Sequence, residues 1–539
     1  MGQAMSLDAA VRGHRRATKE QGNSSEGEAA PLPDTKGGRR AASLVFALPT
    51  VIALAFIVTG IGDRQLWRDE HATWWASSPS LADLSQLIRS IDIVFTPYYV
   101  LMHLWISVAG DSPTALRIPG ALGMAAAAGL LGLLGRRMFT TRVGLIAGVA
   151  FAVLPPVTRY GQEVRPYAFA VAAVLLSTLL LARALAEPTF KVWAAYTFSI
   201  PLIGFSHLAS LAVLAAHLVM VVQARKAGDK IVGWAYTAAG VLGLCFVLPM
   251  ALQGTGQSGQ ISWNNPTAHD LVDLPKQLFG TWTVAAPVLI AGLVGLAFAG
   301  RRALTLGLWV ILPPLLTYAT AAQLHLFLAR YLLFTAPAWV LLAAVALGRL
   351  GGPVSGPRAG AGSSPLRIAG WALAAVAVAG LTWQALPAVR DARGPIAGEP
   401  DYRGAAHYIQ ARQRSGDGIA YSGIMAERRA MDYELRDDPH SPRDVLMYRT
   451  PQQMASYGAA ECPNPVSCLA KTERLWLVAT SLDGNPYSQM PHKTAAALQK
   501  YFRVKTTKKL TGVQVVQFTR ADEKSGNGDD EAAGREVHT

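Results

Sequence analysis

The sequence predicts a polytopic α-helical membrane protein with about eleven transmembrane helices and a small external α/β domain at its C-terminus. Hydrophobic residues make up 51% of the 539 positions and charged residues only 16%, whereas soluble proteins carry about 25% charged residues. Residues 41–386 hold 21 Lys+Arg and 11 Asp+Glu, while the shorter segment 387–539 holds 21 and 19. Apolar runs of about 20 residues, enough to cross a bilayer, recur through the first segment and are missing from the second.

Composition also marks the two ends of the chain. Residues 1–40 are rich in Gly, Ser, Pro, Ala and charge and have no apolar period, so we expect a disordered cytoplasmic tail. We expect residues 41–386 to form a transmembrane domain, 387–520 the external α/β domain, and 521–539 a second disordered tail. The net charge of +14 lies in short clusters between apolar runs and forms no aromatic-interleaved stripe, which argues against nucleic-acid binding.

Eleven apolar segments are expected to cross the membrane. Ten are clear from their length, and the shorter run 192–206 fits as a further span because Lys191 and His207 bracket it closely. In chain order the expected spans are 43–61, 115–135, 143–159, 166–186, 192–206, 207–224, 232–252, 281–299, 303–323, 326–348 and 367–386.

The apolar segment 94–109 decides the orientation of everything after it. If it lies along the outer surface, the internal loops hold 13 basic and 2 acidic residues, and the external loops together with the outer helix ends hold 8 and 9. If it crosses, those 13 positive charges face outward, against the positive-inside rule. We therefore expect a juxtamembrane helix, a plasma-membrane location, a cytoplasmic N-terminus and an extracellular C-terminal domain.

The polar C-terminal segment has the pattern of a small α/β domain. Residues 400–412 have the period of an amphipathic helix, and 493–503 indicate a second helix. The apolar runs GIAYSG, RLWLVAT (474–480) and GVQVVQFTR (512–520) indicate strands.

Two cysteines bracket the short sequence CPNPVSC in this domain. Cys462 and Cys468 would lie in an oxidising compartment, where such a pair forms a disulfide. A zinc site would need two further ligands, and no nearby CxxC or HxxxH supplies them. The sequence thus predicts a disulfide and leaves any metal site unknown.

The first candidate site is QLWRDEHATWW, residues 65–75, directly after the first span. Asp69 and Glu70 are adjacent acids among three Trp residues, at a depth where partial desolvation would raise carboxylate basicity. The alternative is an interfacial aromatic belt with a solvated acidic pair.

The second candidate site is RYGQEVRPYA, residues 159–168. Glu163 is the sole acid of this turn and lies beside Arg165 and Tyr167, although such a Glu–Arg pair is often only a structural bridge. His207 in GFSHLAS is a third candidate, and it could equally satisfy a neighbouring polar group.

The fourth candidate site is HLFLARYLLFTAPAW, residues 325–339, which contains Arg330. An arginine in an apolar run needs an anion or a carbonyl partner, and its fork of donors suits a phosphate. An internal salt bridge to Asp69, Glu70 or Glu163 is the alternative.

These acids and cations could converge on one cavity that faces outward. Carboxylates serve as bases, and Arg or His stabilises a leaving phosphate, so the pattern favours group transfer from a lipid-linked phosphate donor. A transporter or flippase of a lipid-linked sugar is the main alternative, because it needs similar phosphate contacts but no base. An external sensor on a membrane scaffold would leave these motifs without a purpose.

The motifs resemble those of the C-type (GT-C) glycosyltransferases. DE after the first span, TPYY at 96–99, YGQEVRPYA, SHL and ARYLLFTAPAW occur in the order seen in bacterial relatives of the dolichyl-phosphate-mannose protein mannosyltransferases and of the aminoarabinose lipid A transferase. The resemblance covers about residues 43–350. It implies a GT-C-like fold with an outward active site.

The resemblance also implies roles for the candidate residues. Asp69 matches the catalytic base, and Glu70 would bind acceptor or orient the base. Glu163 matches the second-loop acid, where many members have Asp, with Tyr167 beside it. The donor phosphate would be held by Arg165, Arg330 and His207.

The implied reaction is attack of an acceptor oxygen on the anomeric carbon of a polyprenyl-phosphate sugar, with inversion. The sugar would be mannose or another hexose or pentose, and the acceptor a lipid, a glycan or a protein. Arginine alone can stabilise a leaving monophosphate, so no cofactor is required, while a divalent metal is compatible with the site.

Overall fold

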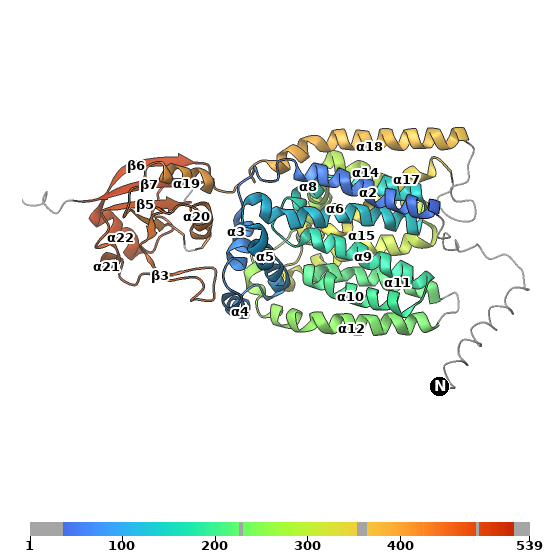
Figure 1. The fold of residues 1–539 in the computed structure, drawn as a ribbon, viewed down its shortest axis with the longest axis horizontal. Helices are drawn as coiled ribbons and strands as arrows, with labels where there is room; N and C mark the ends of the chain where they lie inside the picture. The colour runs from blue at the N-terminus through green and yellow to red at the C-terminus, as the bar shows by residue number, and fades with distance from the viewer. Residues whose placement is uncertain (1–35, 226–229, 353–363, 424, 481–483, 522–539) are drawn as a thin grey trace, which may run out of the picture.

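A bundle of helices and a smaller α/β domain lie end to end in the molecule (Figure 1). The computed structural model describes residues 36–225, 230–352, 364–423, 425–480 and 484–521. The tails predicted at the two ends fall almost wholly outside these ranges.

Six helices in the described ranges are long and apolar enough to cross a membrane. Two further pairs of helices pass the same test together, and each pair is bent at a short break, so that up to eight spans result. The prediction of a multi-pass helical membrane protein is confirmed. The six are α2 (Lys36–Val58), α6 (Pro113–Met138), α9 (Tyr167–Ala186), α12 (Lys230–Thr255), α15 (Ala303–Ala319) and α18 (Ser364–Arg393). The bent pairs are α7 (Thr141–Ala152) with α8 (Pro155–Gly161), at 61°, and α13 (Ala268–Phe279) with α14 (Trp282–Phe298), at 94°.

The three other predicted spans correspond to shorter helices, so the count of eleven stays a prediction. They are α10 (Phe190–Ser206), α11 (Val213–Arg225) and α17 (Ala336–Arg349). The expected start of a span at residue 326 is wrong, because the chain there forms two 3₁₀ turns, η5 (Ala329–Tyr331) and η6 (Leu333–Thr335), and α17 begins with Pro337 in its first turn. Another 3₁₀ segment, η2 (Leu208–Ala212), precedes α11, and short 3₁₀ and helical turns lie at η3 (Ser258–Ile261), η4 (Gly300–Arg302) and α16 (Ala321–Leu324).

Three short helices gather at the end of the bundle that faces the C-terminal domain (Figure 1). They are α3 (Arg68–Ser77), α4 (Leu81–Ser90) and α5 (Thr96–Ala109), with the 3₁₀ turn η1 (Ile93–Phe95) before α5. Helix α5, the segment expected to be juxtamembrane, has 14 residues, fewer than the roughly 20 that a span needs.

Small residues let the membrane helices approach closely. Helix α6 packs against α2, α7 and α9, and a Cβ at Gly132 would overlap the carbonyl oxygen of Val45 in α2. Such close contact between backbones replaces the hydrophobic driving force that is missing between helices in lipid. The bundle thereby fixes the loops at its end.

The C-terminal domain is built on a five-stranded mixed sheet with the order β2-β1-β5-β7-β6. Strand β1 pairs in parallel with β2 and β5, and β7 pairs antiparallel with β5 and β6. The strands are β1 (Gly418–Tyr421), β2 (Arg443–Asp444), β5 (Arg474–Ala479), β6 (Phe502–Leu510) and β7 (Val513–Arg520), and a separate antiparallel pair comprises β3 (Met447–Arg449) and β4 (Ala460–Glu461).

Helices cover both faces of this sheet, which explains why β1 is buried throughout and β5 is apolar and buried after its first residue, Arg474. One core contains side chains of α19 (Tyr402–Gln410) and α20 (Ala426–Glu434), and the other contains side chains of α21 (Pro465–Leu469) and α22 (His492–Tyr501). Cys462 and Cys468 form a disulfide beside α21. The predicted α/β domain is confirmed.

The C-terminal domain packs directly on the loop that follows the first membrane helix. Arg68 pairs with Glu399 at 2.7 Å between Nε and Oε1, and Arg436 donates from Nε to Asp111 Oδ2 at 3.0 Å. The Tyr433 hydroxyl donates to the Asp111 carbonyl at 3.0 Å. These contacts hold the domain over helix α3.

Candidate active site

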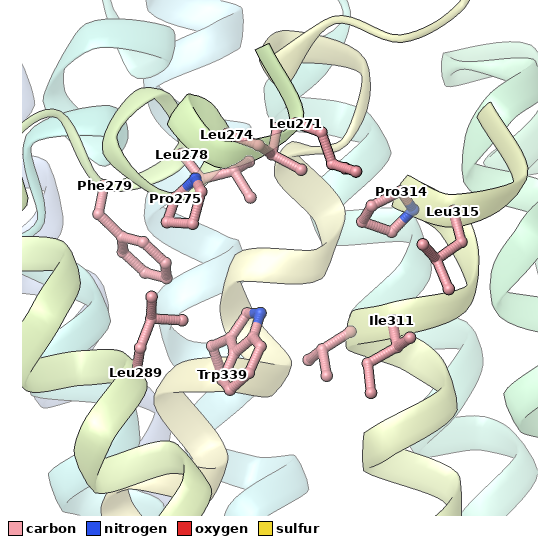
Figure 2. A pocket seen from close by; sticks show the side chains of 11 residues that line it. Leu271, Leu274, Pro275, Leu278, Phe279, Leu289, Ile311, Pro314, Leu315 and Trp339 are labelled. Carbon is pink, nitrogen blue, oxygen red and sulfur yellow. The ribbon is translucent and has the colours of Figure 1, made fainter. Parts of the chain in front are cut away.

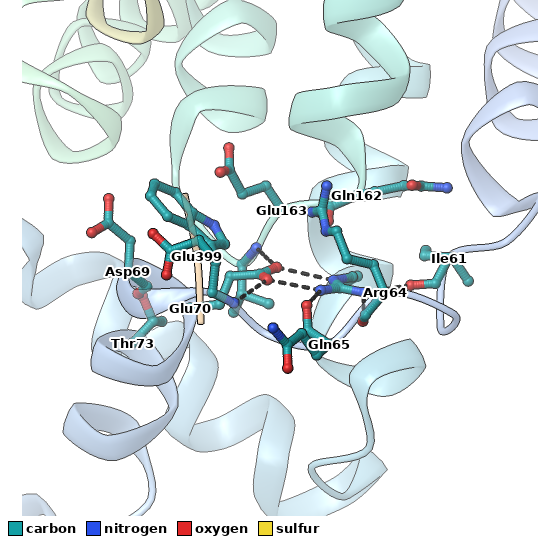
Figure 3. A network of polar contacts seen from close by, with 12 residues as sticks. Ile61, Arg64, Gln65, Asp69, Glu70, Thr73, Gln162, Glu163 and Glu399 are labelled. Carbon is teal, nitrogen blue, oxygen red and sulfur yellow. Dashed lines mark hydrogen bonds and ion pairs between the residues drawn. The ribbon is translucent and has the colours of Figure 1, made fainter. Parts of the chain in front are cut away.

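Helix α3 presents its two adjacent acids in different directions. Asp69 and Glu70 lie in its first turn, where negative charge is stabilised by the helix dipole. Consecutive residues of an α-helix point about 100° apart. Figure 3 accordingly shows the Asp69 side chain pointing away from the hydrogen-bonded network that holds Glu70.

Glu70 is fully buried and has four hydrogen-bond donors. Arg117 donates from Nε to Oε1 at 2.9 Å and from Nη2 to Oε2 at 2.7 Å. The backbone amides of Val164 and Trp67 donate at 3.0 and 3.3 Å. Burial by itself would raise the pKa of Glu70, but the charge and hydrogen bonds of Arg117 lower it below its ordinary value. Glu70 is therefore a paired carboxylate without a free lone pair to offer a substrate.

Arg117 ties this carboxylate to the loop between α2 and α3. Its Nη1 donates to the carbonyls of Ile61 and Arg64, both at 2.9 Å, and its Nη2 also donates to that of Gln65 at 3.2 Å. Since Val164 belongs to the turn before α9, the Glu70–Arg117 pair joins three segments that are far apart in the sequence. It is the structural centre of this end of the bundle.

Asp69 has a very different environment. Its side chain is 24% exposed, and its Oδ2 lies 3.9 Å from Nη2 of Arg330. Within the described ranges its carboxylate accepts no hydrogen bond, and the Thr73 hydroxyl donates to the backbone carbonyl of Asp69. Asp69 therefore keeps lone pairs that can accept a proton.

Arg330 lies on the irregular turn η5, between two aromatic rings. Its guanidinium carbon is 6.0 Å from the ring centre of Trp67 and 5.5 Å from that of Tyr331. Its Nε is buried and has no hydrogen-bond partner in the described part of the chain. Irregular backbone at membrane depth occurs where it is buried in protein or lines a water-filled cavity, and in η5 the neighbours Ala329 and Tyr331 are buried.

Arg165 approaches α3 from the turn before α9. Its Nη1 lies 3.4 Å from Oγ1 of Thr73, one helical turn after Asp69, and its guanidinium stacks over the ring of Phe95 at 4.2 Å. Its buried Nε also lacks a partner among the residues described. A second cation with an unused donor thus lies close to Asp69.

An aromatic group adjoins these cations. The rings of His207 and Tyr331 are 4.4 Å apart, and Tyr167 lies 6.0 Å from each of them. The Tyr167 hydroxyl and the His207 Nδ1 are buried, and neither has a partner in the ranges that the structure covers. An unused buried donor costs about 1–3 kcal/mol, so this set fits an anion that brings its own acceptors.

Glu163 is buried close to Glu70 but is not held in the same way. Neither of its oxygens has a hydrogen-bond partner in the described chain, and Arg159 Nη2 lies 3.6 Å from Oε1. Burial raises the pKa of Glu163 above its ordinary value. Glu163 is therefore more readily protonated than Glu70.

A cavity of about 180 Å³ opens between α13, α14, α15 and α17, and Figure 2 shows the side chains around it. Helix α13 also packs against η5, the turn that carries Arg330. The lining is predominantly apolar and comprises Leu271, Leu274, Pro275, Leu278, Phe279, Leu289, Val310, Ile311, Pro314, Leu315 and Trp339.

The structure brings Asp69, Arg165, Arg330, Tyr167 and His207 to one end of the bundle and places Glu70 behind them. The sequence analysis missed Arg117, although a lone arginine within an apolar helix indicates a buried partner or a functional role. It also missed Tyr331, for which the sequence holds no clear signal. Within the described residues no group of three or more His, Cys, Asp or Glu could hold a metal ion.

Known proteins share the fold of this chain. Residues 96–252 match the family model described as dolichyl-phosphate-mannose-protein mannosyltransferase, and no curated protein sequence matches the chain. The crystal structure of ArnT from Cupriavidus metallidurans bound to undecaprenyl phosphate is similar over 88% of this chain and 98% of that chain, at 14% identity and a TM-score of 0.58. Its apo state gives a TM-score of 0.56 at 14% identity over 89% and 98%.

A further solved structure, the oligosaccharyltransferase of Archaeoglobus fulgidus tethered with an acceptor peptide, covers 89% of this chain and 74% of its own. The identity is 11% and the TM-score 0.46.

Proposed function

We propose that this chain, a relative of the C-type glycosyltransferases, transfers a sugar from a polyprenyl-phosphate donor to an acceptor hydroxyl at the outer face of the membrane. The observation that carries the proposal is the contrast within α3. The Asp69 carboxylate is partly exposed and has only a long ion pair with Arg330, whereas the next residue, Glu70, is fully paired with Arg117.

Asp69 is the proposed general base. Its carboxylate takes the proton of the acceptor hydroxyl while the acceptor oxygen forms a bond to the anomeric carbon. The bond from that carbon to the phosphate oxygen breaks, and the electron pair leaves with the polyprenyl phosphate. Attack on the face opposite the leaving group inverts the anomeric configuration. Glu70 acts as a positioning residue, because its pair with Arg117 fixes the helix that carries Asp69.

The donor phosphate would be held by Arg165 and Arg330, with Tyr167 and His207 beside them. Each has a buried polar atom without a partner in the described chain, and charge-assisted hydrogen bonds to phosphate oxygens are strong. Two guanidinium groups can stabilise the negative charge that develops on the leaving phosphate. The proposal requires no cofactor, and a divalent metal remains compatible with it.

The apolar cavity beside α13 suits the first isoprene units of the donor. It is lined by hydrocarbon side chains, and α13 packs on the turn that carries Arg330. A lipid in this cavity would therefore place its phosphate near the two arginines. In support, the structure of ArnT, which has the same fold, is described as bound to undecaprenyl phosphate.

The charge distribution of the loops supports a cytoplasmic N-terminus and an extracellular C-terminal domain. The active site would then face outward. We propose mannose or another hexose or pentose as the sugar, and a lipid, a glycan or a protein as the acceptor.

The test uses the purified full-length protein in detergent, a series of radiolabelled polyprenyl-phosphate sugars, and acceptor membranes. We expect labelled product and free polyprenyl phosphate with the wild-type protein, and neither with Asp69→Asn. Asp63→Asn is the matched control, because Asp63 is an exposed acid of the same loop, and its variant should keep full activity.

Two outcomes would contradict the proposal. Full activity of Asp69→Asn would show that Asp69 is not the general base. Movement of a lipid-linked sugar across vesicle membranes by the wild-type protein, without a new glycosidic bond from any donor, would favour a transporter.

A further inference from the structure

A second pocket, of about 190 Å³, adjoins the turn that carries Arg330. It is bounded by the loop 263–266, by α13 and by the segment Phe327, Leu328 and Ala329. Ala329 lines this pocket, and the next residue, Arg330, faces Asp69. The pocket therefore adjoins the proposed active site without sharing its charged residues.

The walls of this pocket are held in place by an exchange of hydrogen bonds. The buried Asn264 amide donates to the carbonyl of His325 at 2.7 Å and to that of Phe327 at 3.1 Å. In return, His325 Nδ1 contacts the Asn264 carbonyl at 2.9 Å. His325 adopts a left-handed conformation with φ of 53°, which is uncommon for a residue other than glycine. The two segments thus form a preorganised surface.

The lining combines an aromatic surface with neutral polar groups. Trp263 is 62% exposed, so the face of a large indole ring is available beside the pocket. Gln277 and Asn265 supply amides, which both donate and accept hydrogen bonds. One donor of Asn265 is already used, because its Nδ2 donates to the Ser262 carbonyl at 3.1 Å. The one charged lining residue, Asp270, accepts from the backbone and hydroxyl of Thr267 through Oδ2 and so caps α13.

These lining groups restrict the chemical class of ligand that the pocket can bind. Amides that donate and accept match hydroxyl groups, which do the same. The lack of an uncommitted cation among the lining residues disfavours an anion, and the small volume, below the roughly 300–1,000 Å³ of drug-sized sites, disfavours a peptide. A single neutral ring with hydroxyls on its edge and an apolar face for the indole matches the amides, needs no cation and fits the small volume.

We propose that this pocket binds one sugar ring, with Trp263 as the stacking surface and Asn265 and Gln277 as hydroxyl partners. The inference rests on the proposed function, because the ring would be either the sugar of the lipid-linked donor or a sugar unit of a glycan acceptor. The chemistry of recognition is the same for both sources.

The first test measures binding and does not depend on catalysis. Saturation-transfer NMR of the purified full-length protein with methyl glycosides of mannose, glucose and arabinose should give a signal for at least one of them. Trp263→Ala should abolish that signal and Trp263→Phe should retain part of it. Trp383→Ala is the matched control, since Trp383 is another exposed tryptophan, on α18, at 76%. No signal with the wild type, or equal signals with wild type and Trp263→Ala, would overturn the inference.

The second test separates the two sources. Trp263→Ala should raise either the KM for the donor or the KM for the acceptor by about tenfold, as expected for the loss of an aromatic anchor. The kcat should change by less than about twofold. A change in the donor KM assigns the pocket to the donor sugar, and a change in the acceptor KM assigns it to a glycan acceptor. If neither KM changes, Trp263 is only an interfacial anchor and the inference fails. A wild-type protein that binds the glycosides but forms no glycosidic bond would instead contradict the proposed function.

Discussion

The two sides of helix α3 differ in how their carboxylates are bound. On the buried side, Glu70 accepts four hydrogen bonds and keeps its charge against an arginine. On the open side, Asp69 has one long ion pair with Arg330 and remains partly exposed. Two adjacent acids thus have separate tasks, one holding the loops together and one available for chemistry. The difference comes from burial and hydrogen bonding around each carboxylate, since the two residue types are nearly the same.

Disrupting the buried Glu70–Arg117 pair should give the largest effect, a loss of stability. Arg117→Met leaves the Glu70 charge buried without its partner, which costs about 3–5 kcal/mol of unfolding free energy. Thermal unfolding in detergent measures the loss. Arg183→Met is the control, because Arg183 and Glu187 form an exposed pair at 3.7 Å whose loss should change stability by less than about 1 kcal/mol. Equal melting temperatures for the two variants would contradict the assigned role of Arg117.

A change on the open side should affect activity and leave stability alone. Arg330→Lys keeps the positive charge but loses the fork of donors, and we expect kcat/KM to fall by roughly 10- to 100-fold, the cost of one charge-assisted hydrogen bond. Arg89→Lys, at an exposed position of α4, provides the control. An unchanged kcat/KM in Arg330→Lys would show that the fork does not bind the donor phosphate.

The pH dependence of stability should have opposite signs for the two buried acids. Burial raises the pKa of Glu163 above 4.5, so the folded state binds more protons than the unfolded state above that pH, and stability falls as pH rises. The pKa of Glu70 is lowered, so its contribution is lost only as pH falls below about 4.5. Glu163→Gln should therefore flatten the decline in melting temperature as pH rises above about 4.5. An identical decline in the variant would contradict this assignment.

The smallest effect concerns the support that the C-terminal domain gives to α3. Tyr433→Phe removes the hydroxyl that donates to the Asp111 carbonyl and should cost about 0.5–1.5 kcal/mol, with little change in turnover. Tyr408→Phe, whose hydroxyl has no hydrogen bond in the described chain, is the control. A large loss of turnover in Tyr433→Phe would mean that the domain takes part in catalysis.

Much of the fold followed from apolar periodicity and charge. The membrane helices and the strands β1, β5 and β7 lie close to the predicted segments because continuous apolar runs mark them in the sequence. Strand β6 was missed, since FRVKTTKKL is an exposed edge strand with few apolar residues. The run from 326 was predicted as helix because hydropathy does not distinguish an α-helix from the 3₁₀ turns that place Arg330.

The sequence predicted which residues gather at the site better than it predicted the role of each residue. The resemblance to C-type glycosyltransferases is confirmed at the level of the fold, and the motifs converge at one end of the bundle. The separation of Asp69 from Glu70 was not predictable, because helical geometry gives the angle between two residues but not which of them faces the buried Arg117. That partner comes from a helix more than 40 positions away.

The most direct test of this account compares Asp69→Asn and Glu70→Gln in one experiment, with the initial rate of sugar transfer per folded molecule and the melting temperature as readouts. The account predicts that Asp69→Asn loses about 10²–10⁴ in rate and keeps its melting temperature, whereas Glu70→Gln loses melting temperature and keeps a measurable rate per folded molecule. Full transfer by Asp69→Asn, or loss of transfer by a stable Glu70→Gln, would contradict it.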